Sequence, residues 1–405
     1  MRRRAVLGLL GSVPVLAAPV LVAPVRAAAP LPAIRIGVLG DRSGVGAVTS
    51  GPDQAVAARM AVEDYGTLSA GYPIEILTAE FARRPDDAVE IARKWFDQDN
   101  VAAIVDLPGT AAPVLVQSLA GRRDRSVLNT GSFNAALTGA SCVPTATHWL
   151  EDTRALTMAM TLGLAAEGIK TWFLVVPDDV TGLAFRAGAT EAIEATGGRI
   201  VAIAVHPADA RDYAVALRDA RDSGADAVGL CAVGAELRRQ IGEARTLGVF
   251  DRVRAVCAYG AGIADIHALT PAIARGLRLI SGFYWNQSER TRPFAMRFNA
   301  MTARMPDKPH AATYAAVFHF LRSVETLETI GGAALNTGMR RDAPYFFGVN
   351  GRLRVDGRLM LPMQLYQVKA PDQATAPWDY YMPIRTVPAL DIFRTPKRGG
   401  CPTPV

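Results

Sequence analysis

Short apolar runs alternate with longer alanine-rich runs through most of this chain. The apolar runs are predicted strands, and nearly every one is followed by a segment with helical character. Strand, helix, strand repeats of this kind are typical of parallel sheets, so the pattern predicts an α/β fold. The predicted strands cover residues 34–39, 74–78, 101–106, 126–129, 172–176, 200–205, 225–230, 253–257 and 277–283.

Several predicted strands are apolar at every position. Residues 102–105 read AAIV and residues 173–176 read FLVV, which indicates strands buried on both faces of a sheet. We expect two sheets of four or five strands rather than one large sheet. The passage 142–149, CVPTATHW, interrupts the strand and helix rhythm and predicts a crossover between two lobes.

The helical segments and the C-terminal part add detail. Residues 50–53 resemble a capping box with an early proline, which predicts a helix to about residue 65. Two long helices are expected at 291–305 and 311–330. Residues 346–351 and 355–358 carry hairpin turn chemistry and precede a strand at 363–369. The last thirty residues are rich in proline, and we expect an ordered tail wrapped on the surface.

The N-terminus has the features of a removable export signal. Three arginines at positions 2–4 precede an apolar run, and Val25-Arg26-Ala27 fits a small-residue cleavage site. Export by the twin-arginine route or by the ordinary secretory route remains open. The alternative is a retained membrane anchor. A signal at residues 1–27 predicts a soluble product in the periplasm.

Composition and charge argue against a disordered chain and against a nucleic-acid-binding protein. Half of the residues are hydrophobic and only 20% are charged, so a mostly disordered chain is excluded. The formal net charge of +6 falls to +2 once residues 1–27, with four arginines and no acid, are removed. With no basic run elsewhere, nucleic-acid binding has no support.

Motifs for catalysis, cofactors and metals are missing. The first loop contains Gly44-Val45-Gly46 but lacks the third glycine of a dinucleotide-binding fingerprint. The five histidines never fall at metal-ligand spacing. We therefore expect neither an enzyme, a cofactor nor a metal site.

Three loops rich in small polar residues follow predicted strands. They cover residues 41–51, 108–110 and 130–134, and in an open parallel sheet they lie at one edge. Helix N-termini at that edge present free N–H groups, which suit a carboxylate. Ordinary turn chemistry explains any one of these loops, whereas three on successive units favour a binding site.

The chain resembles substrate-binding proteins of the branched-chain amino acid type of ABC transporter. The likeness runs in order through residues 33–405. It rests on IRIGVLGD at 34–41, AVEIARKWF at 88–96, AIVDLP at 103–108, LTGASC at 137–142, GFYW at 282–285, NGR at 350–352, DGR at 356–358 and PWDYY at 377–381.

This resemblance implies a type I periplasmic binding protein fold: two doubly wound parallel-sheet lobes joined by three crossovers. One lobe would comprise residues 33–147 and 283–338, the other 148–282 and 339–390, with 391–405 as a tail. It also implies a monomer that binds an amino acid or a related small carboxylate between the lobes and delivers it to a membrane permease. A ligand-sensing receptor of the same fold, acting on a signalling partner, is the alternative.

The same resemblance implies the ligand-contacting loops. In the first lobe they contain Ser43, Gly109, Thr110, Ser132, Phe133 and Asn134, and in the second Asp179, Thr181 and Tyr259. We expect the ligand carboxylate between the loops 109–110 and 132–134, held by backbone N–H groups and the side chains of Thr110 and Asn134.

At one position and in one loop the chain departs from the family pattern, and two aromatic walls of the ligand pocket are missing. Gly46 stands where relatives often have tyrosine, and residues 178–182 read DDVTG where relatives read roughly DYAFG. Phe133, Tyr259, Tyr284 and Trp285 could replace the missing aromatic walls. For Tyr284 and Trp285 the alternative is hinge packing, and for Asp179 it is capping of the following helix.

The four cysteines predict one disulfide in an exported protein. Cys231 and Cys257 end buried apolar strands, where free cysteine behaves as a small hydrophobic residue. Cys142 and Cys401 lie in irregular segments, so we expect these two to pair and to tie the tail to the first lobe.

Overall fold

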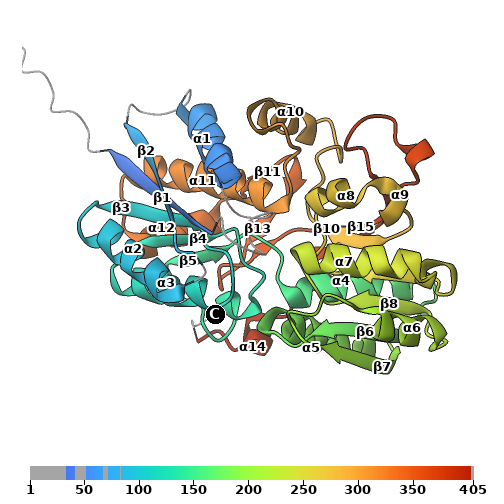
Figure 1. Cartoon of the computed structure of the whole chain (residues 1–405). Helices are drawn as coiled ribbons and strands as arrows, with labels where there is room; N and C mark the ends of the chain where they lie inside the picture. The colour runs from blue at the N-terminus through green and yellow to red at the C-terminus, as the bar shows by residue number, and fades with distance from the viewer. Residues whose placement is uncertain (1–32, 42–51, 67–71, 83, 403–405) are drawn as a thin grey trace, which may run out of the picture.

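The computed structural model describes residues 33–41, 52–66, 72–82 and 84–402. Three features named above lie outside these ranges: the predicted signal at 1–27, Ser43, and the first two residues of the capping box at 50–53. Figure 1 shows two groups of elements side by side, each built around its own sheet.

The first sheet has five parallel strands in the order β2-β1-β3-β4-β5. They are β1 (Ile34–Gly40), β2 (Ile74–Glu80), β3 (Val101–Asp106), β4 (Ser126–Asn129) and β5 (Ala146–His148). β5 falls inside the passage predicted as a crossover. It is three residues long and pairs with β4, with a single further bridge from His148 to Arg358, so its sequence carries too little pattern to predict it.

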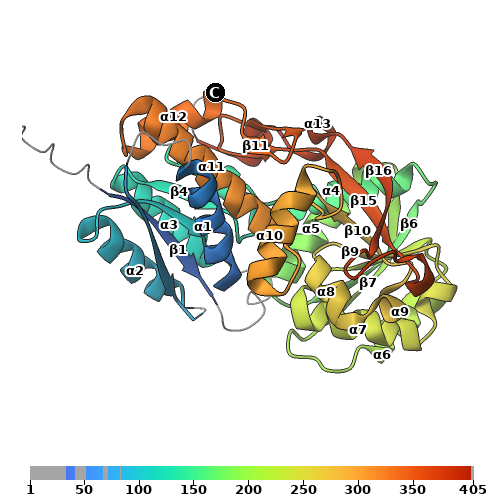
Figure 2. The ribbon, with the colours of Figure 1, turned by 90° about the horizontal axis from the view of Figure 1, so that it is seen from above.

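Helices cover both faces of this sheet, because its central strands are apolar on both sides. α2 (Pro85–Asp97) and α3 (Ala111–Arg122) pack together on one face. α1 (Pro52–Gly66), α11 (Lys308–Leu327) and α12 (Gly332–Arg341) form the other layer, with α10 (Thr291–Thr302) beside α1. Figure 2 shows α10 and α11 returning to this half from late in the chain.

The second sheet has seven strands in the order β16-β15-β10-β9-β8-β6-β7. The parallel strands are β6 (Thr171–Pro177), β7 (Arg199–His206), β8 (Ala227–Leu230), β9 (Ala255–Ala258) and β10 (Arg278–Ser281). β15 (Met363–Val368) and β16 (Tyr381–Val387) complete it in antiparallel pairing. The expectation of four or five strands is therefore wrong for this sheet.

The excess over five consists of the two antiparallel strands, β15 and β16, and β16 lies in the segment predicted as a surface tail. Pro383 lies inside this strand, at a register irregularity in its pairing with β15. Proline is tolerated there because β16 is the edge strand and its other side pairs with nothing in the described sheet.

Helices also cover both faces of the second sheet. α4 (Thr153–Ala165) and α5 (Val180–Ala195) share one hydrophobic cluster with it. The other layer contains α6 (Ala214–Asp222), α7 (Gly234–Thr246), α8 (Ile263–Leu269) and α9 (Pro271–Ala274). Short 3-10 turns η2 (Ala135–Thr138), η3 (Val249–Asp251) and η4 (Pro371–Gln373) lie in the connections.

The chain passes between the two sheets three times: from β5 to α4, from β10 to α10, and from α12 to β15. The last passage contains two small hairpins at the predicted turns. One pairs β11 (Tyr345–Phe346) with β12 (Val349–Asn350), and the other pairs β13 (Arg352–Leu353) with β14 (Leu359–Met360).

After β16 the tail forms α13 (Ala389–Ile392) and α14 (Pro396–Gly399). α13 packs against α4, whereas α14 packs against η2, which directly follows β4 of the first sheet. The structure joins Cys142 to Cys401 in a disulfide and leaves Cys231 and Cys257 buried as free thiols. The tail thus runs from the second sheet to the first and is tied there covalently.

Candidate functional site

A cleft of about 460 Å³ lies where the two groups of elements meet. Its walls come from the loops after β3 and β4, the first turns of α4, α5 and α7, the loop after β9, and the tail. The lining residues are Pro108, Gly109, Thr110, Gly131, Phe133, Asn134, Ala135, Ala136, Ala140, Thr153, Arg154, Val180, Thr181, Ala184, Ala187, Val233, Gly234, Gly260, Arg394 and Gly399.

The two loops of the first half are fixed to each other by side chains. The Ser132 hydroxyl donates to the Gly109 carbonyl oxygen at 2.6 Å and accepts the Asn134 N–H at 3.1 Å. The Asn134 amide donates to the Thr110 carbonyl oxygen at 3.0 Å and accepts the Ala136 N–H at 2.9 Å. Ser132 is itself buried and does not line the cleft, so it acts as a brace. The loops are held in place without a ligand.

Gly109 shows why this loop needs glycine. Its φ of 86° lies in the left-handed region, which a residue with a side chain adopts only with strain. The turn brings the chain directly into α3, whose cap residue Thr110 makes no side-chain capping bond. The Thr110 side chain therefore does not cap the first turn of α3, where Ala111 and Ala112 carry N–H groups and Pro113 does not.

The opposite wall is the first part of α5. Asp179 caps this helix, because its carboxylate accepts the Gly182 N–H at 2.7 Å. Asp179 does not line the cleft, whereas Val180 and Thr181 do. Val180 is 64% exposed, which leaves an apolar side chain free at the cleft wall.

An aromatic layer stands behind the cleft. Phe133 lines the cleft, and its ring centroid lies 6.4 Å from that of Phe185. Tyr259 stacks on the far side of Phe185 at 5.9 Å and is fully buried. Its hydroxyl has no hydrogen-bond partner among the described residues, and burial raises its pKa. Tyr259 is thus placed behind the cleft wall rather than on it.

Tyr284 and Trp285 lie away from the cleft, in the second passage between the sheets. The Tyr284 hydroxyl contacts the Trp378 carbonyl oxygen and the Asp379 carboxylate, both at 3.2 Å. The Trp285 indole N–H donates to the same carbonyl at 2.8 Å. Tyr381 stacks on Tyr284 at 4.7 Å. For Tyr284 and Trp285 the structure favours hinge packing over ligand contact.

Two arginines that the sequence patterns did not single out line the cleft. Arg154 lies in the first turn of α4 and forms an ion pair with Glu191 of α5. Arg394 comes from the tail and donates to the Ala135 carbonyl oxygen at 3.0 Å. Burial, and secondly the charge of Arg394, lower the pKa of Arg154. Nothing in the sequence near position 394 signals this placement.

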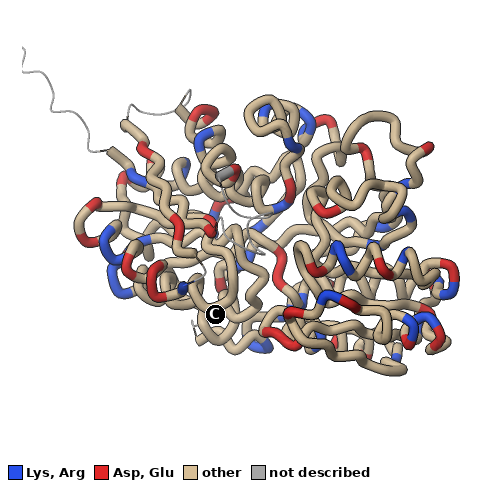
Figure 3. Tube along the Cα trace, in the orientation of Figure 1, with Lys and Arg blue, Asp and Glu red and all other residues tan. Residues whose placement is uncertain are grey.

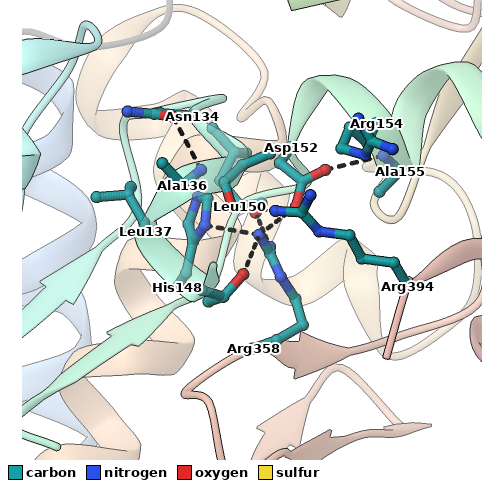
Figure 4. Close-up of polar contacts among 12 residues, drawn as sticks. Asn134, Ala136, Leu137, His148, Leu150, Asp152, Arg154, Ala155, Arg358 and Arg394 are labelled. Carbon is teal, nitrogen blue, oxygen red and sulfur yellow. Dashed lines mark hydrogen bonds and ion pairs between the residues drawn. The ribbon is translucent and has the colours of Figure 1, made fainter. Parts of the chain in front are cut away.

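A buried arginine, Arg358, lies close to the cleft-lining residues Arg154 and Arg394 (Figure 4). Arg358 is 1% exposed, and its guanidinium contacts the Asp152 carboxylate at 2.6 Å and the His148 Nδ1 at 2.7 Å. It also donates to the Leu150 carbonyl oxygen at 2.5 Å. Because a guanidinium only donates, His148 Nδ1 accepts, and its Nε2–H donates to the Ser132 carbonyl oxygen at 2.7 Å.

This cluster connects the hairpin β13–β14, the first passage between the sheets and the loop after β4. Burial, and secondly the charge of Arg358, hold the pKa of His148 well below its usual value. His148 is therefore neutral. Asp152 also caps α4 by accepting the Ala155 N–H at 2.9 Å, so the cluster orients the helix turn that carries Arg154.

Lys and Arg alternate with Asp and Glu over both halves (Figure 3). The described residues contain no group of three His, Cys, Asp or Glu side chains that could hold a metal ion. No helix in the described ranges combines the length and apolar character needed to cross a membrane.

Comparison with known proteins gives consistent results. A family model described as periplasmic binding protein matches residues 33–374. No curated protein sequence matches the chain.

Solved structures are similar over nearly the whole chain. One is a periplasmic binding protein from Burkholderia mallei, with 29% identity, a TM-score of 0.84, and coverage of 91% of this chain and 98% of that one. Another is a branched chain amino acid ABC transporter periplasmic ligand-binding protein from Burkholderia xenovorans, at 27% identity, TM-score 0.86, and 91% and 99% coverage. A solute-binding protein of an ABC transporter from R. palustris in complex with benzoate shares the fold, at 14% identity, TM-score 0.77, and 88% and 97% coverage.

Proposed function

Because this chain belongs to the periplasmic binding protein family of ABC transporters, we propose that it captures an amino acid or a related small carboxylate in the cleft. It then delivers the ligand to an ABC permease in the inner membrane. Members of this family bind solutes and are not enzymes. The similar protein from B. xenovorans is described as a branched chain amino acid ABC transporter periplasmic ligand-binding protein, and the one from R. palustris is in complex with benzoate, which supports a carboxylate ligand.

The observation that carries this proposal is the paired loop structure at the N-terminus of α3. Gly109, Thr110, and Asn134 face the cleft, and Ser132 locks their loops together before any ligand arrives. A carboxylate placed there meets free N–H groups and the positive end of a helix. A preorganised site of this kind binds without a further ordering cost.

The ligand's carbon skeleton would lie against the apolar part of the wall. Phe133, Val180 and Val233 supply that surface. Closure of one lobe, residues 33–147 with 283–338, onto the other, 148–282 with 339–390, would remove water and strengthen the polar contacts. Export by the predicted signal at 1–27 would place the protein in the periplasm.

Thermal-shift and calorimetric measurements on the purified mature protein test this function. A panel of amino acids, aliphatic acids and aromatic acids should contain a compound that stabilises the protein by about 2.7 kcal/mol at 100 times its dissociation constant. Thr110→Val should weaken that compound about tenfold if the hydroxyl donates a charge-assisted bond.

Thr337→Val is the matched control, because Thr337 is exposed on α12 and bonds only within its own helix. It should leave affinity unchanged. Failure of every carboxylate in the panel to bind, or binding of uncharged compounds alone, would contradict the proposed function.

A further inference from the structure

The end of the cleft beside the C-terminal tail is lined by two arginines. Arg154 enters it from α4, and Arg394 enters it from the segment between α13 and α14. No Asp or Glu lines the cleft among the described residues. An ammonium group would therefore find two guanidinium groups here and no carboxylate of the wall to pair with.

The two arginines are not equally neutralised. Arg154 forms an ion pair with Glu191, which stands outside the cleft lining. Arg394 forms no ion pair with a carboxylate of the described chain, and its guanidinium donates to the Ala135 carbonyl oxygen. Since a guanidinium has five N–H donors, most of those of Arg394 remain available. The cleft thus retains one positive charge.

Arg394 is held in place although it lies near the end of the chain. Arg354 donates to its carbonyl oxygen at 2.8 Å, and the disulfide between Cys142 and Cys401 fixes the segment beyond it. The tail packs so closely on Gly139 that a Cβ there would lie 2.6 Å from both the Arg394 guanidinium and the Gly399 carbonyl oxygen. The guanidinium is therefore positioned before a ligand binds.

We propose that Arg394, together with Arg154, binds a second acidic group of the ligand, so that the ligand is a small dicarboxylate. This inference rests on the proposed function. Its first carboxylate occupies the loops at Gly109 and Thr110, and its carbon chain crosses the apolar wall at Phe133. A volume of about 460 Å³ accommodates such a molecule.

A chain-length series of acids separates this inference from the general function. The probes are glutarate, adipate and pimelate, each compared by calorimetry with the monocarboxylate of equal length: valerate, hexanoate and heptanoate. Leucine and glutamate complete the set. We expect at least one diacid to bind about tenfold or more tightly than its monoacid, because Arg394 adds a charge-assisted bond.

Arg394→Gln should weaken diacid binding about tenfold and monoacid binding by less, so that the preference for the diacid is lost. Lys397→Gln is the matched control, because this substitution also removes one positive charge from the tail. Lys397 is exposed and does not line the cleft, so the preference for the diacid should not change. Arg154→Gln is the second variant should Arg394→Gln not fold, and it should also reduce the preference for the diacid.

Equal binding of diacids and monoacids, or tighter binding of leucine than of any diacid, overturns the inference and leaves the proposed function standing. An unchanged diacid preference in folded Arg394→Gln also overturns it. If no acid of any class binds the wild-type protein, the inference and the proposed function are both wrong.

Discussion

Replacing Asp152 by asparagine should test the buried cluster beneath the cleft. The side chain of Arg358 is 1% exposed, so its charge depends on the carboxylate 2.6 Å away. Asparagine removes that charge but keeps an oxygen that accepts the Ala155 N–H, so the cap of α4 survives. The amide nitrogen then faces the Arg358 guanidinium, so the perturbation is the loss of one buried negative charge together with the oxygen that accepts from Arg358.

The expected loss in the free energy of unfolding follows from the contacts that remain. An uncompensated buried charge costs about 3–5 kcal/mol. Arg358 keeps its bonds to Leu150 and His148, and the Asp356 carboxylate, already paired with Arg354, lies two residues away. These contacts place the expected loss near the lower limit, at about 3 kcal/mol.

Urea unfolding of Asp152→Asn, Asp152→Ala, Arg358→Met and the double variant Asp152→Asn/Arg358→Met measures this loss. Asp152→Ala should cost about 1 kcal/mol more than Asp152→Asn, because it also removes the cap. The double variant should be more stable than Asp152→Asn alone, since methionine carries no buried charge. A loss below about 1 kcal/mol for Asp152→Asn, with additive effects in the double variant, would refute the reasoning.

Three further perturbations have defined outcomes. Replacing both Cys142 and Cys401 by serine should lower the free energy of unfolding by up to about 5 kcal/mol in the chain-entropy model. Peptide mapping of the wild-type protein without reduction should recover the two peptides joined. Alkylation of both thiols in native protein would disprove the bond. His310 is buried with its pKa lowered to about 3, mainly by burial, so stability falls as pH drops from about 6.5 toward 3, at about 1.4 kcal/mol per pH unit. His310→Gln keeps an acceptor for the Asp307 N–H, and it should flatten the pH dependence of urea unfolding relative to wild type; an unchanged slope would count against this. Gly139→Ala should push the tail away and cost about 1–3 kcal/mol in thermal or urea unfolding, unlike a substitution at exposed Gly66, which has open space.

The sequence by itself predicted most of the parallel framework. Strands such as β3 and β6 are apolar at nearly every position, and only burial on both faces of a sheet satisfies such a run. Their polar loops must then gather at one edge, which predicted that Gly109, Thr110 and Asn134 would lie together. The structure brings these three to the cleft.

Tertiary structure decided what no local pattern records. β16 forms because β15 offers an edge, although Pro383 makes its own sequence a poor strand. Arg358 is buried because Asp152, 206 residues earlier, meets it, and Arg394 reaches the cleft because the tail is fastened to Cys142. Burial of a charge or the direction of a tail depends on partners distant in the chain, whereas the sequence pattern reports only the faces of a single strand or helix.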